Sequence, residues 1–383
     1  MAETQINSQL VIQKWRTDYY SEFIRKTGLS PYMGKGKNNI YRIVNDLLNT
    51  PGKTINIPLI GALRGNGVSG SQVLVGNEED MATMNDQVMV DFKRNGVVLP
   101  KSTTAYTPID LMNAARDANI EWSTRSFKND SIDALGGIIV AGAALNTGFA
   151  ADSWVPYSSA TAGQRNAYLV NNSDRILFGS ATANASSGVW ATAAALVDTT
   201  NDRMTVAVAE LAKRMAENTG PDATGGVSVS TRTSITPYTS EDGVYSGMVM
   251  FCAPNAFRDV QNDTNMISAN RDARAREGDA YKRNPLFMDG DLLKDGIIYR
   301  KLPELRRLTF SNGTNNVDRN FLCGQAALTV GWGQMPTPRT KKEDDYGFRP
   351  GTAIEELRGH KKTSYLGTNY GVVEILTASV DDA

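Results

Sequence analysis

The chain has 383 residues, of which 41% are hydrophobic and 21% charged, so it is too apolar for a disordered protein and long enough for two or three compact units. Its 40 basic and 41 acidic residues leave a formal net charge of −1, which excludes a strongly basic nucleic-acid-binding protein. Two cysteines in apolar runs, Cys252 and Cys323, form no disulfide framework and have no zinc-site spacing, which predicts buried thiols in a reducing compartment.

Residues 1–45 form an aromatic-rich leader, with Trp15, Tyr19 and Phe23 followed by the breakers Gly28 and Pro31. So many breakers predict an arm carrying one short helix. The first residues lack the layout of a secretory signal. The longest apolar stretch, 136–151, is short for a bilayer and interrupted by polar residues, so we expect no membrane contact and a protein that is soluble and intracellular when made.

Two segments that follow alternate between apolar and polar residues, as strands do. The residues that share one face are Ile55, Ile57 and Leu59 in the first segment and Val88, Val90 and Phe92 in the second. Between them lie about two dozen residues rich in glycine, serine and acid. Because a two-stranded ribbon is barely stable alone, we expect it to lie on other structure, such as a neighbouring copy of the chain.

A long amphipathic helix is predicted over 108–135, with Thr107 as its N-cap and Gly136-Gly137 as its end. At 1.5 Å per residue it would be ~40 Å long. The expected buried stripe, at spacings of four, three and four, is Leu111, Ala115, Ala118 and Trp122.

The rest of the chain mixes both element types. Residues 138–200 show weak periodicity and receive no assignment, whereas 202–218 and 255–263 are predicted helices. Strands are predicted for YSGMVMFCAP (245–254), GIIYRKL (296–302), FLCGQAALTV (321–330) and YGVVEIL (370–376). The fold class is therefore α+β.

Catalysis is poorly supported. The single histidine, His360, lies in the charged run RGHKKTS, and we expect it on the surface, with Lys361 and Lys362 in solvated groups. The run from Gly65 to Gly70 matches a dinucleotide-binding fingerprint with Asp91 downstream, but no helix opens after it and an acidic run follows. The acidic triplet 343–345 is expected to be a solvated turn. No catalytic, cofactor-binding or metal site is predicted.

Eight segments of the sequence, taken in order, resemble those of a known protein family. They are TINIPL, LRGNGVSGSQVLVGNEE, AARDANIEW, CAPNAFRDVQND, RNPLFMDGDLLKDGIIYR, LCGQAAL, EDDYGF and HKKTSYLGTNYGVVEIL. In this order they resemble the N-four-type (gp fifty-six-like) major capsid proteins of tailed bacteriophages, a branch of the Hong Kong 97-like fold. The resemblance covers most of residues 15–377.

The resemblance implies a subunit of pentamers and hexamers in an icosahedral head that encloses double-stranded DNA. It implies an N-terminal arm (1–45), an extended β-hairpin loop with its base (46–101) and a peripheral domain with a spine helix (102–139). Residues 140–335 would be mostly axial domain with some peripheral strands, and 336–383 would return to the peripheral domain. The implied location is the virion. The implied partners are a portal protein, a scaffold or cement protein, and genomic DNA bound without sequence specificity.

Assembly contacts follow from the ribbon. We expect Ile55, Ile57, Val88 and Val90 to pack it on a neighbour or on its own base, and the acidic residues Glu78, Glu79 and Asp80 to meet basic residues of another copy. No lysine lies between residues 61 and 87, so a lysine cross-link from the loop is not expected. The alternatives are an encapsulin-like nanocompartment shell, another virion structural protein, and a soluble enzyme.

Overall fold

A computed structural model describes most of the chain. The described residues are 29–36, 38–48, 50–60, 67–78, 83–102, 111–142, 144–145, 148–149, 152–218, 234–239, 246–274, 287–288, 291–341, 346, 348–365 and 367–381. Most of the arm predicted for 1–45, the N-cap predicted at Thr107 and the acidic triplet 343–345 lie outside these residues.

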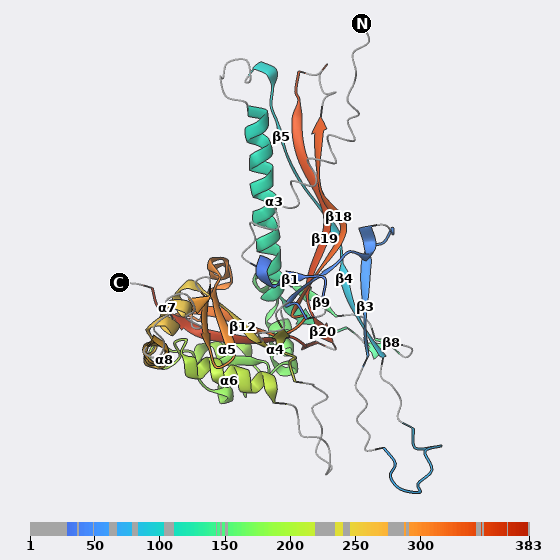
Figure 1. Cartoon of the computed structure of the whole chain (residues 1–383). Coiled ribbons are helices and arrows are strands. Elements are labelled where there is room, and N and C mark those ends of the chain that lie inside the picture. The colour runs from blue at the N-terminus through green and yellow to red at the C-terminus, as the bar shows by residue number, and fades with distance from the viewer. Residues whose placement is uncertain are drawn as a thin grey trace.

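A five-stranded sheet runs beside a long helix and forms one elongated part of the molecule (Figure 1). In spatial order its strands are β1 (Met33–Gly34), β2 (Tyr41–Val44), β18 (Leu328–Lys341), β19 (Gly351–Lys362) and β5 (Asp91–Val98). The helix is α3 (Leu111–Leu135), whose 25 residues correspond to about 37 Å. Strands from three distant parts of the chain thus make one sheet.

A nine-stranded sheet lies at the C-terminal end of α3, on the same side as the chain's C-terminus (Figure 1). Its main path is β10 (Ile176–Phe178), β22 (Val372–Ser379), β17 (Asn316–Cys323), β12 (Ser246–Cys252), β15 (Ile297–Lys301), β14 (Asp291–Lys294) and β13 (Phe287–Met288). Two short strands, β11 (Tyr238–Thr239) and β16 (Phe310–Ser311), pair with β12 and β17. The predicted strands around 245–254, 296–302 and 370–376 are therefore confirmed.

Helices α4 to α8 gather around the nine-stranded sheet (Figure 1). They are α4 (Ala162–Asn171), α5 (Trp190–Ala195), α6 (Val206–Glu217), α7 (Pro254–Asn262) and α8 (Thr264–Arg274). Thr161 caps α4 through a reciprocal capping box with Gln164, and Thr205 caps α6. The helices predicted over 202–218 and 255–263 are confirmed as α6 and α7.

Residues 138–200, which periodicity left unassigned, form several short elements. Besides α4, α5 and β10 they include β6 (Ile138–Val140), β9 (Ser153–Val155), β7 (Ala144–Leu145) and β8 (Gly148–Phe149), with the 3₁₀ turns Tyr157–Ser159 and Thr182–Ala185. Trp190, Phe178 and Tyr168 anchor their separate apolar cluster. Elements this short do not develop a period that sequence reasoning detects.

Two strand predictions need correction. The run 321–330 is not one strand: it ends β17 in the nine-stranded sheet and, after a turn at 324–327, begins β18 in the five-stranded sheet. The run 86–92 likewise divides at Val90 between β4 (Thr83–Met89) and β5. As a result Phe92, expected on the face of Val88 and Val90, is 58% exposed. A change of sheet leaves the apolar pattern unbroken, so alternation alone does not reveal it.

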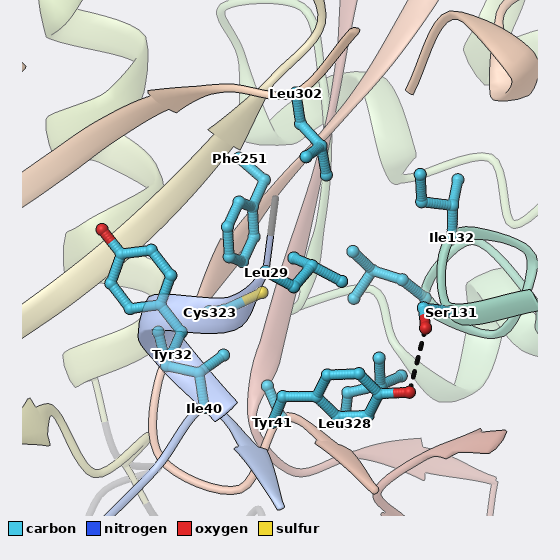
Figure 2. A pocket seen from close by; sticks show the side chains of 12 residues that line it. Leu29, Tyr32, Ile40, Tyr41, Ser131, Ile132, Phe251, Leu302, Cys323 and Leu328 are labelled. Carbon is cyan, nitrogen blue, oxygen red and sulfur yellow. Dashed lines mark hydrogen bonds between the residues drawn. The ribbon is translucent and has the colours of Figure 1, made fainter. Parts of the chain in front are cut away.

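The two sheets meet around an apolar cluster at the end of α3 (Figure 2). Leu29 and Tyr32 from the N-terminal segment, Ile132 from α3 and Phe251 from β12 converge there. The void they leave is about 10 Å³, room for roughly one water molecule. This junction is a packed core and offers no space for a ligand.

Candidate assembly surfaces

The ribbon predicted from alternation is present; its root lies beside the five-stranded sheet, and its far end extends away from both sheets (Figure 1). β3 (Thr54–Ile60) and β4 pair antiparallel, with Ile55 opposite Val88. Together with Val90, both side chains are almost fully buried in the chain's own base, in a cluster with Val44. Ile57 packs on its edge. Of the two expected partners for this face, the chain's own base is the one present; a contact with another copy stays a prediction.

Two glycines of the five-stranded sheet make room for this base. A Cβ on Gly331 would lie 2.5 Å from Cδ1 of Ile55, and one on Gly359 would lie 1.8 Å from the carbonyl oxygen of Met89. Beside them, buried Asp86 forms an ion pair with Lys361, although burial still raises the pKa of Asp86. The hairpin is therefore held at its root by close packing and one covered ion pair.

Lys361 and Lys362 were expected in solvent, and that prediction is wrong. They are 3% and 0% exposed. Lys362 donates to the carbonyl of Gly137 at 3.1 Å and to the hydroxyl of Tyr168 at 2.8 Å, and burial lowers its pKa to about 8. Both lysines are buried because the strand that carries them packs against the hairpin root on one face and against α3 and α4 on the other.

The far end of the hairpin carries an apolar segment that the sequence analysis did not single out. Val73, Leu74 and Val75 are 66%, 56% and 81% exposed. Gly67 and Gly70, both with positive φ and no atom within 4 Å of an added Cβ, form an open loop, so the described half of the fingerprint run opens no helix. Glu78 accepts a 2.7 Å hydrogen bond from the backbone of Gly76. The predicted contacts Glu79 and Asp80 lie outside the described residues.

The outer side of α3 has a hollow of about 200 Å³ near its C-terminal half. Its lining is Trp122, Arg125, Ser126, Asn129, Asp130 and Arg307. The guanidinium of Arg307 bridges both carboxylate oxygens of Asp133 at 3.1 Å. The hollow thus combines one half-buried aromatic ring with two arginines.

The inner side of α3 corrects the predicted stripe. Ala115 is buried as expected, but Ala118 is exposed, and Leu111 and Trp122 are only half-buried. The buried face mixes both kinds of side chain: the polar residues Asn119, Ser123, Thr124 and Ser131 lie among the apolar residues Ala115, Ile120, Phe127, Ile132, Ala134 and Leu135. The stripe was misplaced because it was located by apolar residues alone, whereas the buried face of this helix also includes polar residues that contact charged side chains.

Those charged side chains come from β19, where alternation turns Glu356, Arg358 and His360 toward α3. Asn119 donates to the carbonyl of Thr352, and Ser123 to Glu356 at 3.3 Å. Further along, Arg358 donates to Ser126 at 2.8 Å and to Asp130 at 2.6 Å. Residue numbers rise together on both elements, so helix and strand run in the same direction. We call this series of contacts the polar ladder.

The ladder continues at His360, for which the surface prediction is wrong. His360 is 7% exposed, and its Nδ1 is hydrogen-bonded to the hydroxyl of Tyr41, which also meets Ser131 at 2.9 Å. Phe127 packs edge-on against the imidazole. Burial, and then Arg358, hold the pKa of His360 well below its usual range. A neutral imidazole in this position fills the contact between helix and sheet.

The carboxyl groups of the ladder are pushed apart in pKa. Burial raises the pKa of Glu356 to about 7, although Arg358 NH1 lies 2.7 Å from its Oε1. Asp130 is also penalised by burial, but Arg358, His360 and Lys93 together lower its pKa. Lys93 of β5 contacts both Asp130 oxygens at 2.6 Å. Two carboxyls around one guanidinium thus differ in their affinity for a proton.

A larger hollow, of about 540 Å³, lies where α6, α7 and α8 meet the end of the described chain. Asp263 occupies it and accepts hydrogen bonds from the backbone nitrogens of Val206 and Asn265. Arg258 donates to Asp259 and to the carbonyl of Val380. Its polar groups hold helix ends and the chain terminus, which is a structural role.

Cys252 and Cys323 are fully buried, as predicted, and burial raises the pKa of both thiols. Within that part of the chain no three His, Cys, Asp or Glu side chains group as metal ligands. No described helix combines the length and apolarity that a membrane crossing requires.

Solved structures with the same arrangement are phage capsids. The chain is similar to the capsid subunit of cyanophage Pam1, with 30% identity, a TM-score of 0.79 and full coverage of both chains. The capsid of Ralstonia phage GP4 matches with 21% identity and a TM-score of 0.67, over 92% of this chain and 91% of that one. The head of Helicobacter pylori bacteriophage KHP40 matches with 11% identity and a TM-score of 0.60, over 93% and 91%.

The fold is therefore that of a phage capsid protein, α+β as predicted. The sequence matches the family described as phage capsid protein over residues 3–381, and the chain belongs to that family. No curated protein matches it significantly. As a family member it is a structural component of the phage virion, and the solved structures named above are phage capsids.

Proposed function

We propose that this chain is the major capsid protein of a tailed phage, of the N-four-type branch, and that it builds the pentamers and hexamers of an icosahedral head around double-stranded DNA. The match to a capsid subunit over the full length of both chains supports a role as principal shell subunit. In this role the five-stranded sheet and α3 belong to the peripheral domain, with α3 as its spine, and the nine-stranded sheet belongs to the axial domain.

The observation that carries the proposal is the hairpin itself. Its root is complete within the chain, through Ile55, Val88 and Val90, whereas its far end exposes three successive apolar side chains at 73–75. Exposed apolar segments of this kind mark interaction sites. A rigid root that presents an apolar tip away from its own body favours contact with another copy, and a head-to-tail contact of this kind closes into rings.

The hollow on α3 is the receiving surface that fits this tip. Trp122 offers apolar area to Leu74, and Arg125 offers positive charge to Glu78. Glu79 and Asp80 add two negative charges beside Glu78 in the sequence. Each exposed ion pair contributes only about 0–1 kcal/mol to the contact between two subunits. The apolar contact holds the charged groups in position, and the small energy of each pair is repeated at every copy of the contact in the shell.

Deletion of residues 65–80 tests the proposal. The hairpin root stays intact, so we expect a soluble, folded subunit by circular dichroism that forms no shells by sedimentation and negative-stain microscopy. A charge exchange sharpens the test: Glu78→Lys should weaken assembly, and Arg125→Glu in the same chain should restore part of it. Normal particles from the deletion would contradict the proposal.

The remaining partners follow from a head of this type. We infer a portal protein, a scaffold or a cement protein, and genomic DNA held without sequence-specific contacts; assembly takes place in the host cytoplasm. Since no lysine lies between residues 61 and 87, the shell is held non-covalently, and denaturing gels of particles should show single chains. Nuclease-protected DNA in purified particles distinguishes a phage head from a nanocompartment shell, which encloses protein.

A further inference from the structure

The polar ladder concentrates charge at one place between α3 and the five-stranded sheet. Glu356 has no exposed surface, and Arg358 beside it is 3% exposed. Arg358 reaches across to Asp130 of α3, which also pairs with Lys93 of β5. Two acids and two bases therefore lie between three elements, where most helix–sheet contacts are apolar.

Three of the elements around Glu356 contribute charged or polar groups to its surroundings. From its own strand comes Arg358 and from α3 come Ser123 and Asp130, while Lys93 belongs to β5. Arg358, Ser123 and Lys93 favour the carboxylate, whereas Asp130 and, above all, burial favour the acid. Because burial is the largest influence, the proton is held even though a guanidinium is adjacent.

The hollow on the outer side of α3 lies directly behind this cluster. Ser126 and Asp130 line it, and both accept hydrogen bonds from Arg358 on the inner side. A small displacement of these two side chains would open a path from solvent to Glu356.

We propose that the contact between α3 and β19 is a proton-operated joint, closed when Glu356 carries a proton and loosened when that proton leaves. The ionised group needs solvation that the closed contact does not offer. Water entering through the hollow supplies it and lets α3 shift on the sheet. The apolar junction of Figure 2 holds the C-terminal end of the helix in place, so the movement is a change of tilt and not a release.

The direction of the effect follows from linkage. The pKa of Glu356 rises from its usual 4.5 to about 7 in the folded chain, so the folded state binds the proton more tightly than the unfolded one. The resulting stabilisation is fully present below about pH 4.5 and is lost as the pH rises through about 7. His360 acts in the opposite sense: its lowered pKa makes the contact less stable as the pH falls below 6.5. The joint is therefore tightest in slightly acidic solution.

Hydrogen exchange of the folded, full-length subunit at pH 6 and pH 8 tests the joint, after correction for the intrinsic pH dependence of exchange. Peptides from 111–135 and 351–362 should open about two- to threefold more often at pH 8, because the roughly tenfold effect of Glu356 is partly offset by a roughly fourfold effect of His360 in the opposite sense. Peptides from β12 and β17 should show no such change. In Glu356→Gln, which keeps the shape but cannot ionise, only His360 still titrates, so α3 should open about fourfold less often at pH 8 than at pH 6, the reverse of the wild type.

Glu355→Gln is the matched control. Its carboxylate faces away from α3, pairs with Arg339 and is adjacent in sequence, so this variant should respond to pH like the wild type. Asp130→Asn should move the transition to lower pH, since Asp130 raises the pKa of Glu356. A wild-type α3 whose protection ignores pH, or responds as Glu356→Gln does, would overturn the joint. Neither result bears on shell formation, because the measurement uses unassembled subunits.

Discussion

Strands β12 and β19 are both buried, but the side chains that they bury differ in chemistry. β12 presents an uninterrupted buried run from Gly247 to Cys252, in which Met248, Val249 and Phe251 are all 2% exposed or less. β19 buries Glu356, Arg358 and His360 under α3. Apolar burial is favourable in any direction, whereas a polar contact is favourable only in one register.

This difference determines how much each contact stabilises the folded subunit and how strongly that contact responds to a change of charge. Polar groups that leave water and then pair yield only a small net gain, whereas apolar side chains keep the full benefit of burial. The nine-stranded sheet should therefore supply most of the stability of the subunit. The ladder should fix where α3 lies along the sheet while leaving that contact sensitive to charge.

The largest effect should come from the apolar side. Phe251→Ala removes a ring that Tyr32 contacts edge-on, at 2% exposure, and should lower the free energy of unfolding by about 3–5 kcal/mol. Urea unfolding of the subunit measures it. Phe92→Ala, at a ring that is 58% exposed, is the matched control and should cost less than about 1 kcal/mol. An equal loss of unfolding free energy in the two variants would contradict the idea that the apolar core of the nine-stranded sheet supplies most of the stability.

The glycine notch under the hairpin root tests close packing on the other sheet. Gly359→Ala places a Cβ 1.8 Å from the Met89 carbonyl oxygen and should lower the free energy of unfolding by about 1–3 kcal/mol. Gly163→Ala in α4, where an added Cβ meets nothing within 4 Å, should be neutral or stabilising by up to about 1 kcal/mol. Thermal unfolding of both variants under one buffer gives the contrast. If Gly359→Ala is as stable as the wild type, the backbone of the hairpin root can move away from the added Cβ, and the close packing is not required for stability.

The ladder itself should respond less than the apolar core. Arg358→Met at pH 7 leaves Glu356 without its cation, but the acid can take up a proton, so we expect a loss of about 2 kcal/mol. The double variant Glu356→Met/Arg358→Met removes both buried charges and should recover at least half of that loss. Chemical unfolding of the two variants and the wild type decides this. Should the double variant be the weaker of the two, the ladder would be a main source of stability after all.

The smallest effect on stability should accompany the largest effect on assembly. Leu74→Asp, at a side chain that is 56% exposed, should change the free energy of unfolding by no more than about 0.5 kcal/mol and yet prevent shell formation. Sedimentation of the purified variant measures assembly. Ser71→Asp, at an exposed polar position of the same loop, is the control for added charge and should still assemble.

Much of the fold could be predicted from the sequence wherever a single signal, the pattern of apolar residues along the chain, was sufficient. Alternation located the hairpin and placed Ile55 opposite the second strand, and the length of the 108–135 pattern predicted the long helix. The apolar runs around Cys252 and Cys323 predicted buried thiols. In each case apolar residues mark a buried face, and burial of such residues needs no knowledge of the partner.

The candidate surfaces were less accessible. The acidic side of the loop was noticed, but the apolar run at 73–75 was overlooked within its polar surroundings, although three consecutive apolar residues in a glycine-rich loop were a usable signal. The hollow around Trp122 was not predicted because Trp122 had been assigned to the buried stripe. Arg307, from a distant turn, reaches it only in the folded chain.

The sequence by itself determined the class of fold, the projecting hairpin, the long helix and the membership of a capsid family, since these depend on local periodicity and on the order of segments along the chain. Only the tertiary structure decided that a charged run such as RGHKK lies buried. A charge enters the interior when partners from other elements satisfy it, and here Asp130 of α3 and Asp86 of β4 lie 228 and 275 residues away in the sequence from Arg358 and Lys361.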